Sequence, residues 1–324
     1  MPSYQLDVLI PAYNAERFLP TCLASVRKAH RDGYRFLFID DHSTDATPEI
    51  LEAAAAESPF IDFVRNDRNL GVAASRNVLH GLVDARYLTY LDVDDWYGEN
   101  HLESMVRAID DLEVDFLRTD HVIVDGLKRT VARTPETQRG IRLDPANAFG
   151  VPGPRSPLNY LYIWAGIYDL ERLNLTDYAF HEHLRTASDR PWIWKLYLDQ
   201  RSTAAIDLDT YFYRKSTNAT ALTQRGDAAT LDFLVASEII LGMATASGNA
   251  RAVDKAAHSL LFLVDYHLER AGRLTAALTA ELTSRSAALL ATCPTDSIEA
   301  ALPAFSAQSL ARLRPVLAGL EVTA

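Results

Sequence analysis

Three carboxylates fall within four residues at the end of an apolar run. Residues 90–96 read YLDVDDW, so Asp92, Asp94 and Asp95 come directly after an apolar stretch that is typical of a strand. Side chains two apart on an extended chain can approach one point where the chain bends. Carboxylate oxygens suit Mg²⁺ or Mn²⁺, ions that also bridge to substrate phosphates. The pattern therefore predicts a divalent-cation site that neutralises charge on a leaving diphosphate, and solvated turn acids with a helix cap are the alternative.

The elements that must position these acids alternate along the first 95 residues. Apolar runs closed by turn residues predict strands, and apolar residues at helical spacing between them predict helices. The expected strands are residues 6–10, 36–39, 61–64 and 87–91, and the expected helices are 15–30, 47–56 and 73–83. Such alternation predicts an α/β fold with a mostly parallel sheet flanked by helices. In such sheets ligands bind beyond the carboxyl ends of the strands, where Asp40, Asp41 and Asp92 lie.

The rest of the chain continues this pattern and then becomes wholly helical. Between residues 100 and 213 we expect a helix, a strand near 114–124, a proline-rich loop or hinge at 151–157, a core segment at 158–175, a helix at 187–198 and a strand at 203–213. From about residue 228 the sequence is Ala- and Leu-rich with helical spacing. We therefore expect a catalytic domain over 1–225, with a nucleotide-binding half (1–97) and an acceptor half (98–225), and a C-terminal α-helical domain over 226–324.

Composition and charge exclude several classes of function. The chain has 324 residues and a formal net charge of -11, which argues against a nucleic-acid binder. The same charge argues against docking on an anionic membrane through overall charge, although a local basic patch stays open. Cys22 and Cys293 lie far apart and fit reduced thiols of a cytosolic protein. No secretory signal is visible, and no apolar run reaches the roughly 18 residues that span a bilayer. We therefore expect no transmembrane segment and a cytoplasmic location. Recruitment to the inner face of the membrane stays open.

Four short motifs occur in a fixed order in the first third of the chain. They are IPAYN at residues 10–14, IDDHSTD at 39–45, NLGVAASRN at 69–77 and the YLDVDDW strand end at 90–96. Four motifs in order are a much stronger signal than any one of them, and together they resemble family 2 glycosyltransferases. The resemblance implies a GT-A, Rossmann-like fold and the transfer of a sugar, with inversion, from a nucleotide-sugar donor. It also implies a carbohydrate or glycolipid acceptor, in polysaccharide, cell-wall polymer or glycolipid assembly.

The resemblance assigns donor-binding roles to residues of the first two motifs. It implies that Pro11, Tyr13 and Asp41 contact the nucleotide base and ribose, with Asn14 beside them in the donor site. A carboxylate such as Asp41 can accept the imide N–H of uracil, which favours a UDP-sugar. Tyr13 can offer a flat face to the base, and a core aromatic is its alternative. For Asp45 we expect a helix cap rather than a ligand.

The later motifs supply the groups expected near the diphosphate. The resemblance implies that Arg76 helps to hold the donor, that Asp92 serves the donor ribose or the metal shell, and that Asp94 binds the metal, Mn²⁺ or Mg²⁺. Residues 213–217 resemble the family's mobile segment over the diphosphate, where Arg214 can make a fork-shaped phosphate contact. The alternatives are a surface salt bridge for Arg76 and a solvated strand-end charge for Arg214.

An inverting transfer also needs a base to remove the acceptor hydroxyl proton. The family usually places it in an acidic pair roughly a hundred residues past the metal motif. The matching stretch is 181–192, HEHLRTASDRPW, in which Ser188 and Asp189 stand where the family often has Glu-Asp. We assign the base to Asp189, with Glu182 and a plain helix cap as alternatives. His181 and His183 are expected to be ordinary loop histidines rather than a metal or acceptor pair.

Other residues and rival functions complete the expectations. Trp164 and Trp192 fit either sugar stacking or the core, and the polar residues His258, His267 and Glu269 fit the edge of a packed helix. The C-terminal helices are candidates for homo-oligomerisation or for acceptor binding. A degenerate scaffold acting through this helical tail is the main rival function. The chain lacks the Gly-rich basic loop that a nucleotidyltransferase needs after the first strand. It also lacks the Gly-x-Gly-x-x-Gly motif of a dinucleotide-binding dehydrogenase.

Overall fold

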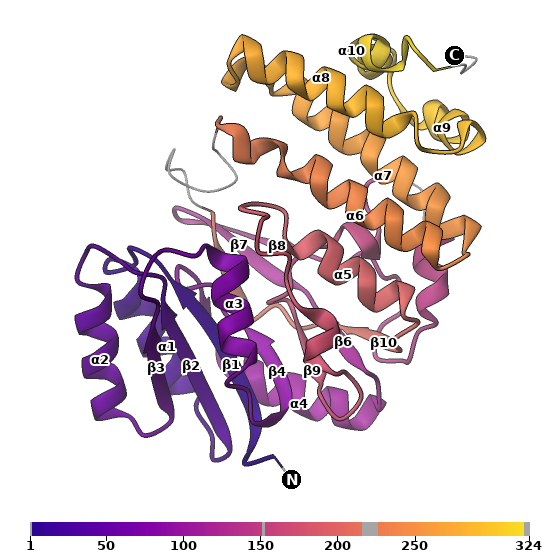
Figure 1. Cartoon of the computed structure of the whole chain (residues 1–324). Helices are drawn as coiled ribbons and strands as arrows, with labels where there is room; N and C mark the ends of the chain where they lie inside the picture. The colour runs from indigo at the N-terminus through magenta and orange to yellow at the C-terminus, as the bar shows by residue number, and fades with distance from the viewer. Residues whose placement is uncertain (1, 151–152, 216–225, 321–324) are drawn as a thin grey trace. The chain divides into compact units, whose positions relative to one another are not determined.

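The computed structural model describes residues 2–150, 153–215 and 226–320, and the chain forms two compact units (Figure 1). The first unit comprises Met1–Asp144, Tyr162–His183 and Arg201–Ser216, and the second comprises Pro145–Leu161, Leu184–Gln200 and Thr217–Ala324. Parts of the expected acceptor half thus group with the C-terminal helices. The domain boundary near residue 225 stays a prediction. Both cysteines are buried and free, as expected.

A seven-stranded sheet forms the centre of the first unit, in the order β10-β6-β9-β4-β1-β2-β3. The parallel strands β1 (Tyr4–Ala12), β2 (Tyr34–Asp40), β3 (Ile61–Arg65) and β4 (Ala85–Tyr90) confirm the four expected from the apolar runs. Strand β9 (Gly166–Asp169) lies antiparallel to β4 and β6. The mostly parallel α/β sheet predicted from the sequence is confirmed.

Helices of the first unit bury one apolar stripe each. They are α1 (Leu19–Ala29), α2 (Thr47–Glu57), α3 (Val72–His80) and α4 (His101–Leu112). In α1 the stripe is Leu19, Cys22, Leu23 and Val26, all at most 4% exposed. This is the i, i+3, i+4, i+7 spacing of a helix that packs on a core. Prolines occupy the first turns of α1 and α2, where a missing N–H costs nothing.

A second, four-stranded sheet has the order β5-β11-β7-β8 and corrects two predictions. The single strand expected near 114–124 is two strands, β6 (Phe116–Thr119) and β7 (His121–Asp125), which lie in different sheets. The strand expected at 203–213 likewise divides into β10 (Thr203–Ile206) and β11 (Tyr211–Arg214). The first break falls at buried Asp120, whose carboxylate accepts a hydrogen bond from Thr134 N at 2.8 Å. The other two strands, β5 (Trp96–Tyr97) and β8 (Lys128–Ala132), were not expected.

The second unit is helical, as the Ala- and Leu-rich pattern predicted. Its helices are α5 (Asp189–Leu198), α6 (Asp232–Ala246), α7 (Ala250–Glu269), α8 (Ala276–Leu290), α9 (Thr295–Ala301) and α10 (Ala307–Leu317). Helix α7 supplies core residues such as Leu260, Leu261 and Val264. His267 is half-buried and stacks on Phe233 with ring centroids 4.0 Å apart. It therefore takes part in the packing of the helices and is not only a polar residue at the helix edge.

One segment qualifies the expectation about membrane spans. Among the described residues, Ala228–Ala246 has the length and a mean hydropathy of 1.5 that would let a helix cross a membrane, by those criteria alone. The sequence reading missed it because Asp232 and Glu238 interrupt the apolar run. Half of this window is buried inside the structure, which is also the property of a core helix.

The buried histidine at the start of α4 generates a prediction on pH. His101 is fully buried, its Nδ1 lies 3.0 Å from Thr210 Oγ1, and burial lowers its pKa to about 3. The unfolded chain takes up this proton below about pH 6.5, so the neutral buried ring costs stability as the pH falls through that value. We expect His101→Gln to reduce the loss of unfolding free energy between pH 7 and pH 5 by up to about 2 kcal/mol.

Denaturant unfolding at both pH values measures this difference. The control is His183→Gln, which replaces an exposed histidine. An unchanged pH dependence in His101→Gln would show that this histidine is not the group that titrates on unfolding.

Candidate active site at the carboxyl ends of the strands

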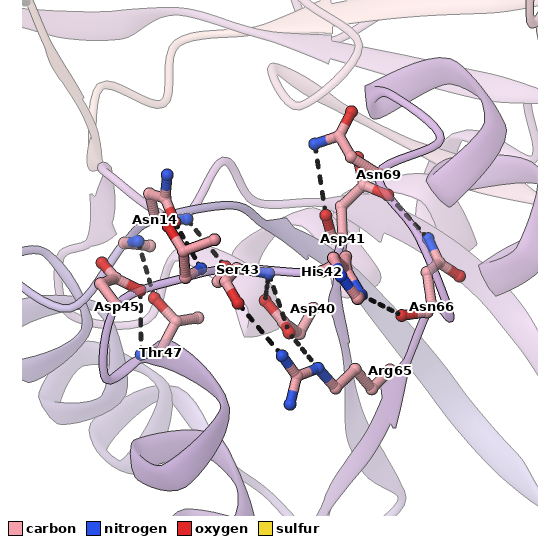
Figure 2. Close-up of polar contacts among 12 residues, drawn as sticks. Asn14, Asp40, Asp41, His42, Ser43, Asp45, Thr47, Arg65, Asn66 and Asn69 are labelled. Carbon is pink, nitrogen blue, oxygen red and sulfur yellow. Dashed lines mark hydrogen bonds and ion pairs between the residues drawn. The ribbon is translucent and has the colours of Figure 1, made fainter.

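The loops that follow β1 and β2 are joined by side-chain hydrogen bonds (Figure 2). Asn14 N donates to Ser43 Oγ at 2.8 Å, and Thr44 N donates to Asn14 Oδ1 at 2.9 Å. Ala15 N donates to Thr47 Oγ1 at 2.7 Å. Asn14 has a φ of 48°, a left-handed conformation that asparagine tolerates better than most residues. Its side-chain oxygen therefore serves the joint between the two loops, and the donor contact expected of Asn14 stays a prediction.

Asp45 and Glu16 extend this joint with reciprocal hydrogen bonds. Glu16 N donates to Asp45 Oδ2, and Ala46 N donates to Glu16 Oε2, both at 3.1 Å. The other oxygen of Asp45 accepts from Thr47 N, the first residue of α2. Asp45 therefore bonds to the first turn of α2, but the N-cap residue of this helix is Ala46, so Asp45 is not its N-cap.

The joined loops present Tyr13 and Pro11 at the end of β1. Tyr13 is 50% exposed, so the alternative that it is a core aromatic is wrong. Pro11 is half-buried within β1, beside Ala12, whose backbone oxygen accepts from Asp41 N at 2.8 Å. An exposed ring on a fixed loop is a surface on which a planar base can stack.

Asp41 is almost completely buried and holds the loop that leads into α3 (Figure 2). Its Oδ1 accepts from Leu70 N and from Asn66 Nδ2, at 2.8 and 2.9 Å, and its Oδ2 accepts from Gly71 N at 2.8 Å. Gly71 has a φ of 89°, a backbone conformation that favours glycine. Three of the roughly four acceptor positions of this carboxylate are thus used within the fold. A contact between Asp41 and a uracil imide stays a prediction, and it has to use the remaining acceptor position of this carboxylate.

The neighbouring Asp40 has a separate structural role. It is fully buried at the end of β2, where both its oxygens accept from Ser43 N at 3.1 and 3.2 Å. Arg65 Nε lies 3.0 Å from its Oδ2. The two adjacent acids therefore serve different loops, and the charge of Asp40 is balanced by Arg65.

The Asp92–Asp95 turn follows β4, and its third acid is the most buried. Asp95 is 1% exposed; its Oδ2 accepts from Tyr211 Oη at 2.8 Å and its Oδ1 from Arg214 N at 2.6 Å. Arg214 Nε in turn donates to Asp94 O at 2.8 Å. Asp95 thereby fastens the turn to β11, a strand more than a hundred residues away. Sequence reasoning gave Asp95 no separate role, because nothing in the sequence shows that its partner is Tyr211.

Two arginines lie against this turn. Arg76, on α3, is 4% exposed, and one of its guanidinium nitrogens lies 3.3 Å from Asp92 Oδ1. The surface salt bridge considered for Arg76 is therefore a buried one. Arg214 stacks its guanidinium over Trp96 at 4.8 Å from the ring centroid. It is a strand-end cation, as the sequence suggested, but one held by an aromatic face.

The remaining acid, Asp94, differs from its neighbours. Among the described residues, no other residue donates a hydrogen bond to its carboxylate. Burial, and then the nearby charge of Asp92, raise the pKa of Asp94 to about 6. A carboxylate in this position gains from a cation. The hard oxygen donors of Asp94 and Asp92 fit Mg²⁺ or Mn²⁺.

The protein alone supplies few ligands at this place. Within the described residues there is no group of three or more His, Cys, Asp or Glu side chains that could hold a metal ion. A cation on Asp94 and Asp92 therefore has to complete its shell with water or with oxygens of a bound substrate, as Mg²⁺ commonly does.

An aromatic cluster supports β11 behind the turn. Trp164 stacks on Tyr211 with ring centroids 4.1 Å apart and on Tyr213 at 5.5 Å. Trp164 is 3% exposed, and Trp192 of the second unit is 4% exposed. Of the two readings left open for these tryptophans, the core is confirmed and sugar stacking is not supported.

The segment with Glu182 and the two loop histidines is fastened to α3. Asn77 Oδ1 accepts from Phe180 N at 2.8 Å, and Asn77 Nδ2 donates to Phe180 O and to Glu182 Oε1 at 2.9 and 3.0 Å. The rings of His181 and His183 lie 5.8 Å apart. They belong to no group of three or more metal-ligating side chains in the described chain, and their role as ordinary loop histidines stays a prediction. Sequence reasoning missed the role of Asn77, although it closes the third motif.

Asp189 is the first residue of α5, in the second unit. The helix begins there because Ala187, with a φ of 59°, turns the chain, and because Pro191 lies in the first turn. Ser188 is the N-cap residue, so Asp189 is not the plain helix cap considered as its alternative. Its role as the base stays a prediction.

Comparison with known proteins finds one matching family model. The model described as "Glycosyl transferase family 2" matches residues 7–158. The chain is 28% identical to the minor teichoic acid biosynthesis protein GgaA of Bacillus subtilis, over 68% of this chain and 49% of that protein. It is 24% identical to the processive diacylglycerol beta-glycosyltransferase of Mycoplasma pneumoniae, over 72% of this chain and 70% of that protein.

The fold also has solved relatives. The structure of Staphylococcus aureus TarS residues 1–349 with UDP-GlcNAc superposes with a TM-score of 0.71, over 92% of this chain and 83% of that one, at 19% identity. This likeness confirms the GT-A-type architecture. The chain spans less than two thirds of the length of several curated relatives, from 13% to 62%.

The buried Asp41 yields a prediction that separates its two roles. Asp41→Asn keeps the shape of the side chain but replaces one acceptor oxygen with a donor, which leaves Gly71 N or Leu70 N unpaired. We expect the unfolding free energy without any ligand to fall by about 1–3 kcal/mol. Thermal or denaturant unfolding measures it. Unchanged stability combined with weaker UDP binding would instead assign Asp41 to base recognition alone.

Proposed function

We propose that this chain, which belongs to glycosyltransferase family 2, is a metal-dependent, inverting glycosyltransferase. It moves a sugar from a nucleoside-diphosphate donor to a hydroxyl acceptor. The observation that carries this proposal is the Asp92–Asp95 turn at the end of β4. Two of its acids have partners within the protein, and the third, Asp94, has none to its carboxylate among the described residues.

Asp94, with Asp92, is the candidate to hold Mn²⁺ or Mg²⁺ against the donor diphosphate. When bound there, the ion would stabilise the negative charge that develops on the leaving diphosphate. Arg76 fixes the position of Asp92 through their 3.3 Å ion pair. Arg214 is the second candidate for diphosphate charge, because its backbone is tied to Asp95 and its guanidinium stacks on Trp96.

The donor site proposed here lies at the ends of β1 and β2. The exposed ring of Tyr13 would stack on the base, with Pro11, Asn14 and Asp41 around it. A uridine nucleotide is favoured because Asp41 retains one acceptor position for an imide N–H. The complex of the structural relative TarS with UDP-GlcNAc supports the same choice.

The transfer would need one proton acceptor from the chain, for which Asp189 is the candidate. The carboxylate of Asp189 takes the proton of the acceptor hydroxyl while the oxygen of that hydroxyl attacks the anomeric carbon of the donor sugar. The bond from that carbon to the diphosphate breaks on the opposite face, so the configuration inverts and an α-linked donor gives a β-linked product. A positioned base of this kind contributes roughly 10²–10⁴-fold to the rate.

Relatives suggest the class of acceptor and its place in the cell. One is named for teichoic acid biosynthesis and another for a diacylglycerol acceptor. These names support a carbohydrate, wall-polymer or glycolipid acceptor. Use of such an acceptor in the cytoplasm or at the inner face of the membrane is part of the proposal.

Replacement of the proposed base gives the test of this function. Asp189→Asn removes the proton acceptor but keeps the side-chain size, and we expect the release of UDP from a panel of UDP-sugars with Mn²⁺ to slow about 10²–10⁴-fold. The matched control is Asp199→Asn, at the other end of α5, which removes the charge from the partly exposed pair with Lys195.

The outcomes of this assay distinguish the proposals. Equal turnover by Asp189→Asn and wild type would move the base elsewhere, with Glu182 the first alternative. Absence of turnover with any UDP-, GDP-, CDP- or dTDP-sugar would contradict the enzyme and favour a degenerate scaffold.

A further inference from the structure

The hairpin of β7 and β8 ends in an unusually exposed leucine. The strands are joined by Gly126 and Leu127, and Asp125 pairs with Lys128 across the turn. Gly126 has a φ of 58° at the first turn position, which is the position that needs glycine in a type II′ hairpin turn. Leu127 follows and is 100% exposed, whereas the next most exposed large hydrophobic residue in the described chain, Tyr13, is 50% exposed.

The strand that leaves this turn is exposed on both of its faces. Residues 128–131 of β8 are all exposed, and Val131 is 43% exposed. Successive side chains of a strand point to opposite faces, so an edge strand that packs on a core buries every second residue. The tip of this hairpin therefore projects from the sheet. An alternative explanation for the cations of β8 is that charges on an edge strand prevent it from pairing with a strand of another molecule. That explanation does not account for the exposed leucine.

Positive charge gathers at the same place. Residues 125–142 hold five Lys or Arg against two Asp or Glu, in a chain whose net charge is -11. Arg133 and Arg139 pair with buried Asp120 at 3.2 and 3.0 Å. In the described part of the chain, Arg129 donates to the backbone oxygens of Gly126 and Lys128, and Lys128 makes no ion pair. Thus neither of the two cations next to the exposed leucine forms an ion pair in the described chain.

We propose that the hairpin tip, defined as Leu127, Lys128, Arg129 and Val131, docks the protein on an anionic membrane surface. The apolar side chains would enter the boundary between headgroups and acyl chains, and the two cations would lie against lipid phosphates. A short apolar anchor and a basic cluster are each marginal alone and effective together. Cations near an anionic leaflet each add roughly a fivefold gain in binding. The overall negative charge makes the interaction weak and sensitive to salt.

The position of the hairpin connects this surface to the candidate active site. Strand β7 pairs in parallel with β11, and Val124 is the partner of Arg214. Leu127 lies three residues beyond Val124, or about 10 Å along an extended chain. If the proposed glycosyl transfer is correct, this docking brings the diphosphate side of the site close to the bilayer, where an acceptor carried on a lipid would lie. The docking itself does not depend on that activity.

Vesicle flotation of the full chain tests the proposal without any turnover. The probes are phosphatidylcholine vesicles with and without phosphatidylglycerol, at low and high salt. We expect binding only to the anionic vesicles. This binding should be lost at about 1 M salt, where the Debye length is about 3 Å instead of about 10 Å at about 0.1 M. The double variant Lys128→Glu/Arg129→Glu should lower the partition coefficient at least about tenfold, and Leu127→Ser should lower it about three- to tenfold.

Matched controls make the result specific to the hairpin. Lys28→Glu/Arg107→Glu reverses the same two charges at exposed positions of α1 and α4, and Leu82→Ser removes another partly exposed leucine. Both should bind as wild type does, and all variants should keep the wild-type release of UDP from soluble donor. The proposal is overturned if wild type does not float with anionic vesicles, or if the controls lose binding equally. Concentration-dependent self-association that Leu127→Ser abolishes, without vesicle binding, would assign the tip to a second copy of the chain instead.

Discussion

Like charges placed at the end of one buried strand have to be balanced, and the Asp92–Asp95 turn shows how this chain does it. Asp95 is buried and accepts hydrogen bonds from Tyr211 and Arg214, and Asp92 pairs with the buried Arg76. Asp94 receives no such partner among the described residues, and its raised pKa records the cost. A cation that is shared with a phosphate substrate is the simplest compensation, and the proposed function depends on it.

Much of the first unit serves to hold this arrangement. The aromatic cluster around Trp164 supports β11, which supplies Tyr211 and Arg214 to the turn. On the other side, hydrogen bonds between the loops after β1 and β2 fix the exposed ring of Tyr13. The loop into α3, which carries Arg76, is held by Asp41. An edge built in this way is preorganised, so a ligand that bound there would spend little binding free energy on ordering it.

The sequence predicted the parts of this site that depend on local pattern. Apolar runs of strand length placed β1 to β4, and the ends of those strands placed Asp41, Asp92 and Asp94 at one edge. It could not show the partners of Asp95 and Asn77, because Tyr211 and Phe180 lie about a hundred residues away along the chain. The sequence also predicted β6 and β7 as one strand, and β10 and β11 as one strand, for a related reason. An apolar run does not reveal that the chain changes sheets where Asp120 is buried.

The most direct test of the central claim is the binding of UDP with and without Mn²⁺, measured by calorimetry. It compares wild type, Asp94→Ala and Asp111→Ala, an exposed acid of α4 that serves as the control. We predict binding that depends on the metal in wild type and in the control, and at least about a tenfold loss in Asp94→Ala, which corresponds to about 1.4 kcal/mol. Binding of UDP that is equally tight without the metal, or unaffected by Asp94→Ala, would contradict the claim that this carboxylate holds the cation.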